Sequence, residues 1–132
     1  MKKKVAFVCI HNSCRSQMAE GWAKEIGKGI IDAYSAGTED YPSPKPMAVE
    51  VMEDAGIDMS LHTSKLIEDI PEIDILVTMG CGVECPYVPC EHREDWGLTD
   101  PSGGPKSEFE ITRDIIKEKV IDLLERIERG EL

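Results

Sequence analysis

The sequence predicts an α/β fold of three layers, in which a four-stranded parallel sheet carries helices on both faces. Two observations predict it. Short apolar runs that suit buried strands alternate with longer segments of helical periodicity, an order typical of parallel sheets. The length of 132 residues fits one hydrophobic core. We therefore expect a single domain over residues 1–132.

Four strands are expected in chain order. Lys4 to Cys9 is an apolar run that suits a strand buried on both faces. Further strands are expected over 30–35 and 73–79, and a short one over 95–98. Binding sites of such sheets lie beyond the carboxyl ends of the strands. The segments after Cys9 and after Met79 are therefore the places where a site is expected.

Three helices and one helical turn connect these strands. The first helix is expected over about 15–25, and the second over 47–52 between prolines and a glycine. A helical turn is expected at 64–69 and a long helix at 106–129. The apolar face of this last helix is expected to comprise Ile115, Ile116, Val120, Leu123, Leu124 and Ile127.

The charge and hydropathy of the chain exclude several classes of protein. A net charge of −11, from 26 acidic and 15 basic residues, argues against a nucleic-acid binder. No apolar stretch approaches the roughly 20 residues that cross a bilayer, so no membrane partner is expected. The apolar run near the N-terminus is six residues long, too short for a signal peptide. A cytoplasmic monomer is the expectation.

The chain contains five cysteines. Structural disulfides are rare in a reducing compartment, so this number favours thiol chemistry or metal binding. An odd number also means that the cysteines cannot all pair within one chain.

The segment from Cys9 to Ser16 places a cysteine, five residues and Arg15 between a predicted strand and a predicted helix. The backbone N–H groups of such a loop, together with the helix N-terminus, can bind a tetrahedral oxyanion. Arg15 can then bind two of its oxygens, and the same field stabilises a thiolate at Cys9. A small apolar cysteine at the end of a buried strand is the alternative interpretation.

At this point the residues resemble a known family. The run from Cys9 to Trp22 is similar to the opening of low-molecular-weight tyrosine phosphatases, and still more to that of thioredoxin-coupled arsenate reductases. Ser-Ala-Gly at 35–37, His-Thr-Ser at 62–64 and Asp-Trp-Gly-Leu-Thr-Asp-Pro at 95–101 recur there in the same order. The resemblance covers essentially the whole chain. It implies the low-molecular-weight phosphatase fold and the reduction of arsenate to arsenite without a cofactor, with phosphate or sulfate as mimics of arsenate.

The resemblance also implies roles for single residues. Cys9 would be the nucleophile, Arg15 the oxyanion clamp, Ser16 the hydroxyl that stabilises the thiolate, and Asp100 the general acid. Asp100 precedes a proline, so without the family it would be interpreted as a turn residue. Cys14 is interpreted as structural, and His11 as a residue at the mouth of the site. The oxyanion-binding loop would consist of Cys9, Ile10, His11, Asn12, Ser13, Cys14 and Arg15.

A reductase must supply two electrons, and the cysteines after the third strand offer them. The resemblance implies that Cys81 attacks the Cys9 adduct, that Cys85 then attacks Cys81, and that thioredoxin reduces the final disulfide. The spacing of Cys81 and Cys85 is shorter than in well-known members of the family. Cys90 is additional and is an alternative to either of them.

One position departs from the family pattern in a way that suggests a hypothesis. Some relatives bind potassium beside the loop, through residues that match Asn12, Glu20 and Ser35 and through an aspartate after His-Thr-Ser. This chain has Lys65 at the aspartate position. We hypothesise that the Lys65 ammonium replaces potassium and braces the loop; a solvated surface lysine is the alternative.

Three other functions remain open from the sequence. A phosphotyrosine phosphatase would normally carry aromatic residues after Asp100-Pro101, which this chain lacks, although weak phosphatase activity is expected. A zinc module would use Cys81, Cys85, Cys90 and His92, but these spacings match no familiar finger, and no metal site is expected. A non-catalytic partner-binding protein would leave the Cys9, Arg15 and Asp100 set unexplained.

Overall fold

The computed structural model describes residues 2–9, 12, 14–39, 42–60, 62–80 and 89–132. In this part of the chain four parallel strands form one sheet in the order β2-β1-β3-β4. The strands are β1 (Lys3–Cys9), β2 (Ile31–Gly37), β3 (Ile75–Thr78) and β4 (His92–Asp95). The predicted fold class, an α/β protein with a four-stranded parallel sheet, is confirmed.

The register brings the carboxyl ends of the strands together. Cys9 pairs with Gly37 across β1 and β2, and Val8 pairs with Thr78 across β1 and β3. Thr78 in turn pairs with Asp95 at the end of β4. The groups that follow these strands therefore meet at one edge of the sheet, where a site was expected.

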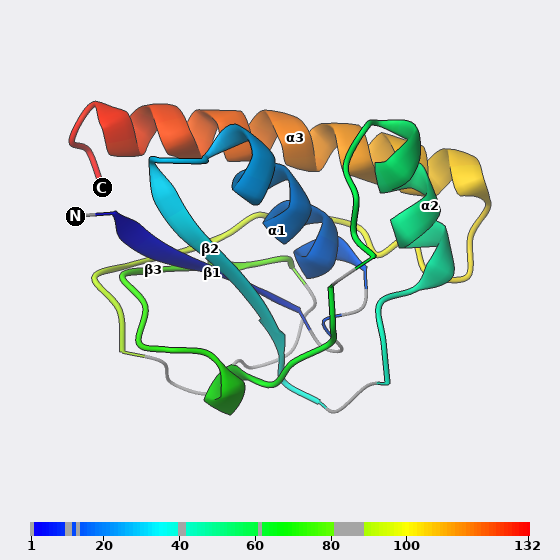
Figure 1. The fold of residues 1–132 in the computed structure, drawn as a ribbon, viewed down its shortest axis with the longest axis horizontal. Helices are drawn as coiled ribbons and strands as arrows, with labels where there is room; N and C mark the ends of the chain where they lie inside the picture. The colour runs from blue at the N-terminus through cyan, green and yellow to red at the C-terminus, as the bar shows by residue number, and fades with distance from the viewer. Residues whose placement is uncertain (1, 10–11, 13, 40–41, 61, 81–88) are drawn as a thin grey trace.

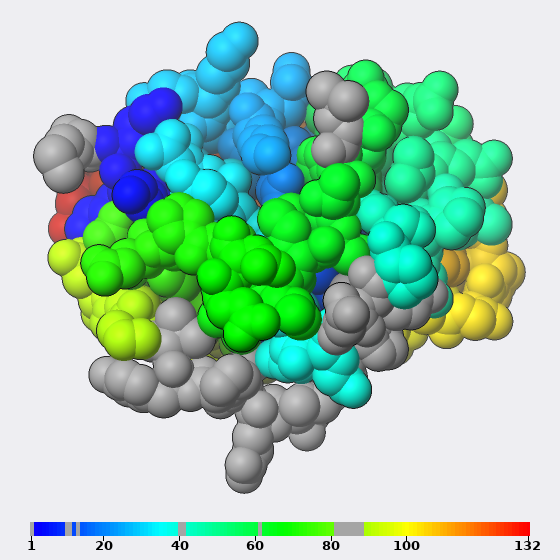
Figure 2. Space-filling model, turned by 60° about the horizontal axis from the view of Figure 1, so that its bottom comes forward, coloured from blue at the N-terminus to red at the C-terminus, as the bar shows by residue number. Residues whose placement is uncertain are grey.

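The three long helices share one face of the sheet (Figure 1). They are α1 (Arg15–Ile26), α2 (Pro46–Asp54) and α3 (Lys106–Glu128). The opposite face is covered by the short 3₁₀ helix η1 (Ile67–Asp69) and the chain that flanks it, which lie over the sheet in Figure 2. None of the helices in the described residues combines the length and the apolar character that a membrane span requires.

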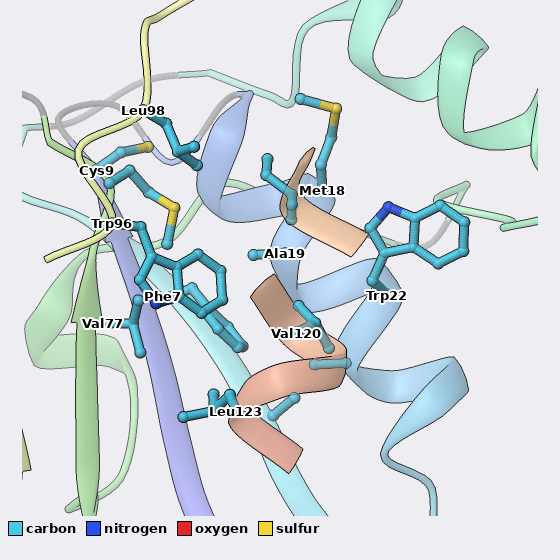
Figure 3. Packing of buried hydrophobic residues seen from close by; sticks show 14 of the residues in the cluster. Phe7, Cys9, Met18, Ala19, Trp22, Val77, Trp96, Leu98, Val120 and Leu123 are labelled. Atoms are coloured by element: carbon cyan, nitrogen blue, oxygen red, sulfur yellow. The ribbon is translucent and has the colours of Figure 1, made fainter. Parts of the chain in front are cut away.

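Alternation along β1 divides the apolar residues between two clusters. Val5, Phe7 and Cys9 belong to the main core beneath the helices, and Ala6 and Val8 belong to the smaller cluster on the η1 side. Figure 3 shows part of the main core, with Cys9 at the end of β1. The rings of Phe7 and Trp96 lie 5.5 Å apart within it. The nucleophile predicted from the sequence therefore sits at the edge of a packed core.

Two sequence predictions were wrong in detail. The fourth strand runs over His92–Asp95 and not over 95–98, because Trp96 and Leu98 are buried after the strand rather than within it. Ile115 does not belong to the apolar face of α3, where it is 43% exposed. The buried face follows the helical repeat through Phe109, Thr112, Ile116, Val120, Leu123 and Leu124.

The edge strand β4 is tied to α3 by a partly buried ion pair. Both guanidinium Nη atoms of Arg126 lie 2.8 Å from the carboxylate oxygens of Glu94. His92 Nε2 lies 2.7 Å from one of these oxygens, and Trp96 Nε1 donates to the other at 2.7 Å. The hydrogen bonds from Arg126 lower the pKa of Glu94 to about 2, against the opposing effect of burial. Glu94 is therefore ionised at all physiological pH values.

We expect Glu94→Gln to destabilise the fold at neutral pH by on the order of 2 kcal/mol, because the bidentate pair loses its charge and one acceptor. The folded-state pKa lies below the ordinary value of 4.5, so this stabilisation is complete above about pH 4.5. It is lost as the pH falls towards 2. Urea unfolding of both proteins across this range measures the difference.

Asp122→Asn is the matched control, because Asp122 contacts the same Arg126 at 2.9 Å but is mostly exposed. An exposed pair within one helix contributes roughly 0.3–0.5 kcal/mol. Equal losses in the two variants would contradict a special role for Glu94.

Candidate active site

The side chain of Cys9 lies at the end of β1 and contacts the first turn of α1. Its Sγ is 2.9 Å from Ser16 Oγ. Asn12 Nδ2 donates to the same Oγ at 2.9 Å. Since the amide already fills an acceptor position of this hydroxyl, the hydroxyl hydrogen is left to point at sulfur. The Ser16 hydroxyl is therefore placed for the role that the resemblance implies, the donation of a hydrogen bond to the sulfur of Cys9.

The positive end of the α1 helix dipole is available to interact with an anion. The residue before the helix, Cys14, makes no side-chain capping hydrogen bond, and the first turn contains no acidic residue. The partial positive charge of the helix is therefore not neutralised by its own sequence. It acts on the Cys9 thiolate and on any anion that binds in front of it.

Asn12 is the centre of a buried hydrogen-bond network. It adopts a φ of 53°, the left-handed region that asparagine tolerates better than most residues. Its side-chain oxygen accepts from Gln17 Nε2 and from the backbone N–H of Lys65, both at 2.9 Å. Its backbone oxygen accepts from Gln17 Nε2 at 3.0 Å and from Ser64 Oγ at 2.9 Å. Asn12 is thus held to both α1 and the backbone and side chains at residues 64–65.

Gln17 and His62 form a second link that the sequence did not predict. Gln17 Nε2 also donates to Thr63 O at 2.8 Å, so Gln17 Oε1 is the atom that faces His62 Nδ1 at 2.9 Å. Burial lowers the pKa of His62 despite the nearby Glu20 carboxylate, which favours the neutral ring with hydrogen on Nδ1. Both residues lie in motifs shared with the family, Gln17 in the run from Cys9 to Trp22 and His62 in His-Thr-Ser, but nothing in the sequence indicates that they pair.

Arg15 is buried and fixed by two backbone carbonyls. Its Nη1 donates to Met79 O at 3.0 Å and to Leu98 O at 2.8 Å. Its Nη2 lies 3.7 Å from Asp100 Oδ2. Only one edge of the guanidinium is used by these carbonyls, so the other can bind an oxyanion in front of Cys9.

Asp100 lies at the exposed side of the site. Burial alone would raise its pKa, but the hydrogen bond from Ser102 N and the positive charge of Arg15 lower it. The carboxylate is therefore ionised when the site holds no anion. Asp100 forms a turn, as its position before a proline predicted, and it also faces Arg15.

The thiol of Cys14 differs in character from a nucleophile. Burial, reinforced by the negative charge of Asp100, raises its pKa to about 12. The thiol is therefore protonated near neutral pH, and a protonated thiol is a poor nucleophile. This agrees with the structural interpretation of Cys14.

Lys65 lies where the sequence hypothesis put a cation. Its Nζ is 3.5 Å from Glu20 Oε1 and donates to Thr63 O at 2.9 Å. Ser35 Oγ donates to the same Glu20 oxygen, and Lys24 Nζ lies 2.7 Å from the other. Burial would raise the pKa of Glu20, but these hydrogen bonds and charges lower it. With the ammonium held at the carboxylate, these residues do not fit potassium.

Cys90 is half-buried and packs against the cluster on the η1 side of the sheet, whereas Cys9 belongs to the main core. His92 contacts Glu94. Among the described residues no group of three possible metal ligands is brought together. The other residues predicted for the site lie outside the described part of the chain: Ile10, His11, Ser13, Cys81 and Cys85.

The geometry can be compared with known proteins. Residues 4–131 match the profile of the family described as low molecular weight phosphotyrosine protein phosphatase. An arsenate reductase of Staphylococcus aureus is 47% identical over 121 residues, which cover 88% of this chain and 92% of that protein. The chain belongs to this phosphatase family, among its arsenate reductases.

Solved structures of arsenate reductases share the fold. One, described as being in the phosphate binding state, superposes with a TM-score of 0.88 at 45% identity and covers 96% of this chain and 99% of its own. A thioredoxin-dependent arsenate reductase of Corynebacterium glutamicum has a TM-score of 0.80 at 25% identity. This chain matches it over 98% of its own length and 63% of the other chain.

We expect Ser16→Ala to slow the alkylation of Cys9 by iodoacetamide at neutral pH by roughly tenfold, because the thiolate loses its hydroxyl donor. Mass spectrometry of the labelled peptides gives the rate for each cysteine. Cys14 should stay unlabelled in both folded proteins. Rapid labelling of Cys14, or a rate at Cys9 that Ser16→Ala leaves unchanged, would contradict this account of the two thiols.

Proposed function

We propose that this protein reduces arsenate to arsenite, with Cys9 as the nucleophile. The observation that carries the proposal is the contact of the Ser16 hydroxyl, which Asn12 also binds, with the sulfur of Cys9, together with the buried Arg15, because these groups suit a thiolate nucleophile and an oxyanion clamp. The arsenate reductase relatives support arsenate as the substrate, and the relative described in the phosphate binding state supports the binding of a tetrahedral oxyanion.

The first step forms a covalent adduct. The Cys9 thiolate attacks arsenic, and an oxygen of arsenate leaves as water after it has taken up a proton. Asp100 is the donor that we propose for this proton. An arsenate that binds Arg15 offsets the positive charge that lowers the pKa of Asp100. It also adds negative charge beside the Asp100 carboxylate. Both effects raise the pKa of Asp100, so the carboxyl can hold a proton when substrate is bound.

The second step transfers two electrons. A Cys81 thiolate attacks the sulfur of Cys9, the electrons of the sulfur–arsenic bond go to arsenic, and arsenite leaves. The Cys9–Cys81 disulfide is then attacked by Cys85, which frees Cys9 and leaves a Cys81–Cys85 disulfide. Cys90 packs on the opposite side of the sheet from Cys9, which disfavours Cys90 as the cysteine that attacks Cys9.

The reductant we propose is thioredoxin, whose two thiols reduce the Cys81–Cys85 disulfide. The thioredoxin-dependent relative of Corynebacterium glutamicum supports this partner, and relatives described in reduced, intermediate and oxidised states support a cycle of disulfides. Such a cycle requires a reducing compartment, so we propose the cytoplasm as its location. A single chain contains every residue of the proposed cycle, which agrees with the predicted monomer.

The test of the function is arsenate-dependent oxidation of NADPH in the presence of thioredoxin and thioredoxin reductase. We expect turnover by the wild-type protein and background rates for Cys81→Ala and Cys85→Ala, since each removes one step of the relay. Both variants should still hydrolyse p-nitrophenyl phosphate, because that reaction needs Cys9 but no electrons.

Cys90→Ala is the matched control and should retain turnover. Cys9→Ala should lose both activities. If arsenate drives no oxidation of NADPH while phosphate esters are cleaved well, the protein is a phosphatase and the distal cysteines need another explanation.

We also propose that Lys65 is a built-in cation that braces the loop. Its backbone N–H donates to Asn12 while its ammonium contacts Glu20, so one residue joins the loop to the buried carboxylate. Wild-type activity should be the same in sodium and potassium salts. Lys65→Met should lower kcat/KM by roughly tenfold, or about 1.4 kcal/mol, and Lys65→Asp should make activity respond to potassium.

Lys24→Met is the matched control, because Lys24 contacts Glu20 but makes no contact with Asn12. It should change kcat/KM much less than Lys65→Met. A strong rise of wild-type activity on addition of potassium would count against the built-in cation.

A further inference from the structure

Asp95 joins the ends of β3 and β4 through three hydrogen bonds. Its Oδ1 accepts from Thr78 Oγ1 at 2.6 Å and from Gly80 N at 2.8 Å. Its Oδ2 accepts from Gly97 N at 3.1 Å. A single carboxylate thus satisfies donors from two neighbouring strands, at the edge of the sheet where the proposed active site lies.

The residues that Asp95 holds surround the two carbonyls that fix Arg15. Thr78 and Gly80 flank Met79, and Gly97 directly precedes Leu98. Met79 O and Leu98 O are the acceptors of Arg15 Nη1. A shift of Gly80 or Gly97 therefore also shifts the neighbouring carbonyl oxygen of Met79 or Leu98, which accepts a hydrogen bond from Arg15.

The two glycines allow this junction to be unusually tight. Gly80 and Gly97 have φ values of 77° and 58°, in the left-handed region that favours glycine. A Cβ atom on Gly80 would lie 2.5 Å from Gly97 Cα, which no side chain can do. The junction also contains the hydrogen bonds from Trp96 N to Thr78 O at 2.8 Å and from Leu98 N to Met79 O at 3.0 Å.

We propose that Asp95 is a positioning residue that sets the orientation of the Arg15 guanidinium for oxyanion binding. Arg15 recognises an oxyanion through directed hydrogen bonds, so its orientation decides the affinity. Among the described residues the hydrogen bonds of Asp95 do not include Cys9, Ser16 or Asn12, so the hydroxyl donor to the Cys9 sulfur does not depend on Asp95. The proposal rests on the proposed function, since it assigns to Arg15 the role of binding the substrate oxyanion.

Phosphate serves as the probe, and its affinity is measured by calorimetry and by its protection of Cys9 against iodoacetamide. We expect Asp95→Ala to raise the Kd of phosphate by about tenfold, and the concentration of phosphate that protects Cys9 by the same factor. The alkylation rate of Cys9 without phosphate should not change. Faster alkylation of Cys9 in Asp95→Ala without phosphate would reject the proposal in favour of a general loosening of the fold.

Asp95→Asn should show a smaller increase of the Kd, because its amide oxygen still accepts from Thr78 and Gly80 while its NH₂ group faces the Gly97 N–H. Glu94→Gln is the matched control on the same strand. It loses the contact with Arg126 and should lower stability while leaving the Kd of phosphate unchanged.

The outcomes separate this proposal from the proposed function. Phosphate binding by the wild-type protein that Asp95→Ala leaves unchanged would reject the role of Asp95 alone. Equal increases of the Kd in Asp95→Ala and Glu94→Gln would also reject it, in favour of a general structural effect. A wild-type protein that binds no phosphate would reject the oxyanion site, and the role of Asp95 with it.

Discussion

The buried side chain of Asn12 connects the first turn of α1 to the backbone of a residue 53 positions further along the chain. It donates to Ser16 on α1 and accepts from Gln17 and from the backbone of Lys65. Asn12, Ser16 and Gln17 are fully buried, so a donor or acceptor of theirs left without a partner would be costly. Asn12 thereby ties the first turn of α1, which carries Arg15, to the segment at Lys65.

The charges around the site explain how a strongly acidic molecule can bind an anion. A molecule with a net charge of −11 must attract an anion to one place. The positive groups there are the N-terminus of α1 and Arg15, while the buried Glu20 behind the loop is balanced by Lys24 and Lys65. Exposed carboxylates more than about 10 Å away are screened at physiological salt. At the site, the nearby positive groups therefore outweigh the negative net charge of the molecule.

Most of the fold could be predicted from the sequence because it depends on local patterns. The strand that ends at Cys9 and the long helix from Lys106 follow apolar periodicity, and the structure has both. The fourth strand was misplaced because His92–Asp95 is an edge strand composed of ionisable residues, which hydrophobic patterns do not reveal. Ile115 was assigned to the wrong face because adjacent residues of a helix can share its buried face, as Leu123 and Leu124 do, and only packing decides which adjacent pairs are buried.

The candidate site was predictable to the extent that its residues form contiguous motifs. Cys9, Arg15 and Ser16 belong to one run of sequence, and the structure brings Cys9 against Ser16 while Arg15 is buried; their roles stay a prediction. The contributions of Gln17 and His62 arise from long-range hydrogen bonds across 45 residues, which no spacing in the sequence indicates. The same is true of Asp95, whose partners come from another strand.

The composition of β4 has a consequence for how copies of this molecule meet. An unpaired edge of a sheet is a template on which a second chain can add a strand, and repeated addition leads to aggregates. All four residues of β4 are ionisable, and Glu94 is held by Arg126. A second strand laid along this edge would have to desolvate these charges. The charges of this edge therefore disfavour intermolecular strand addition.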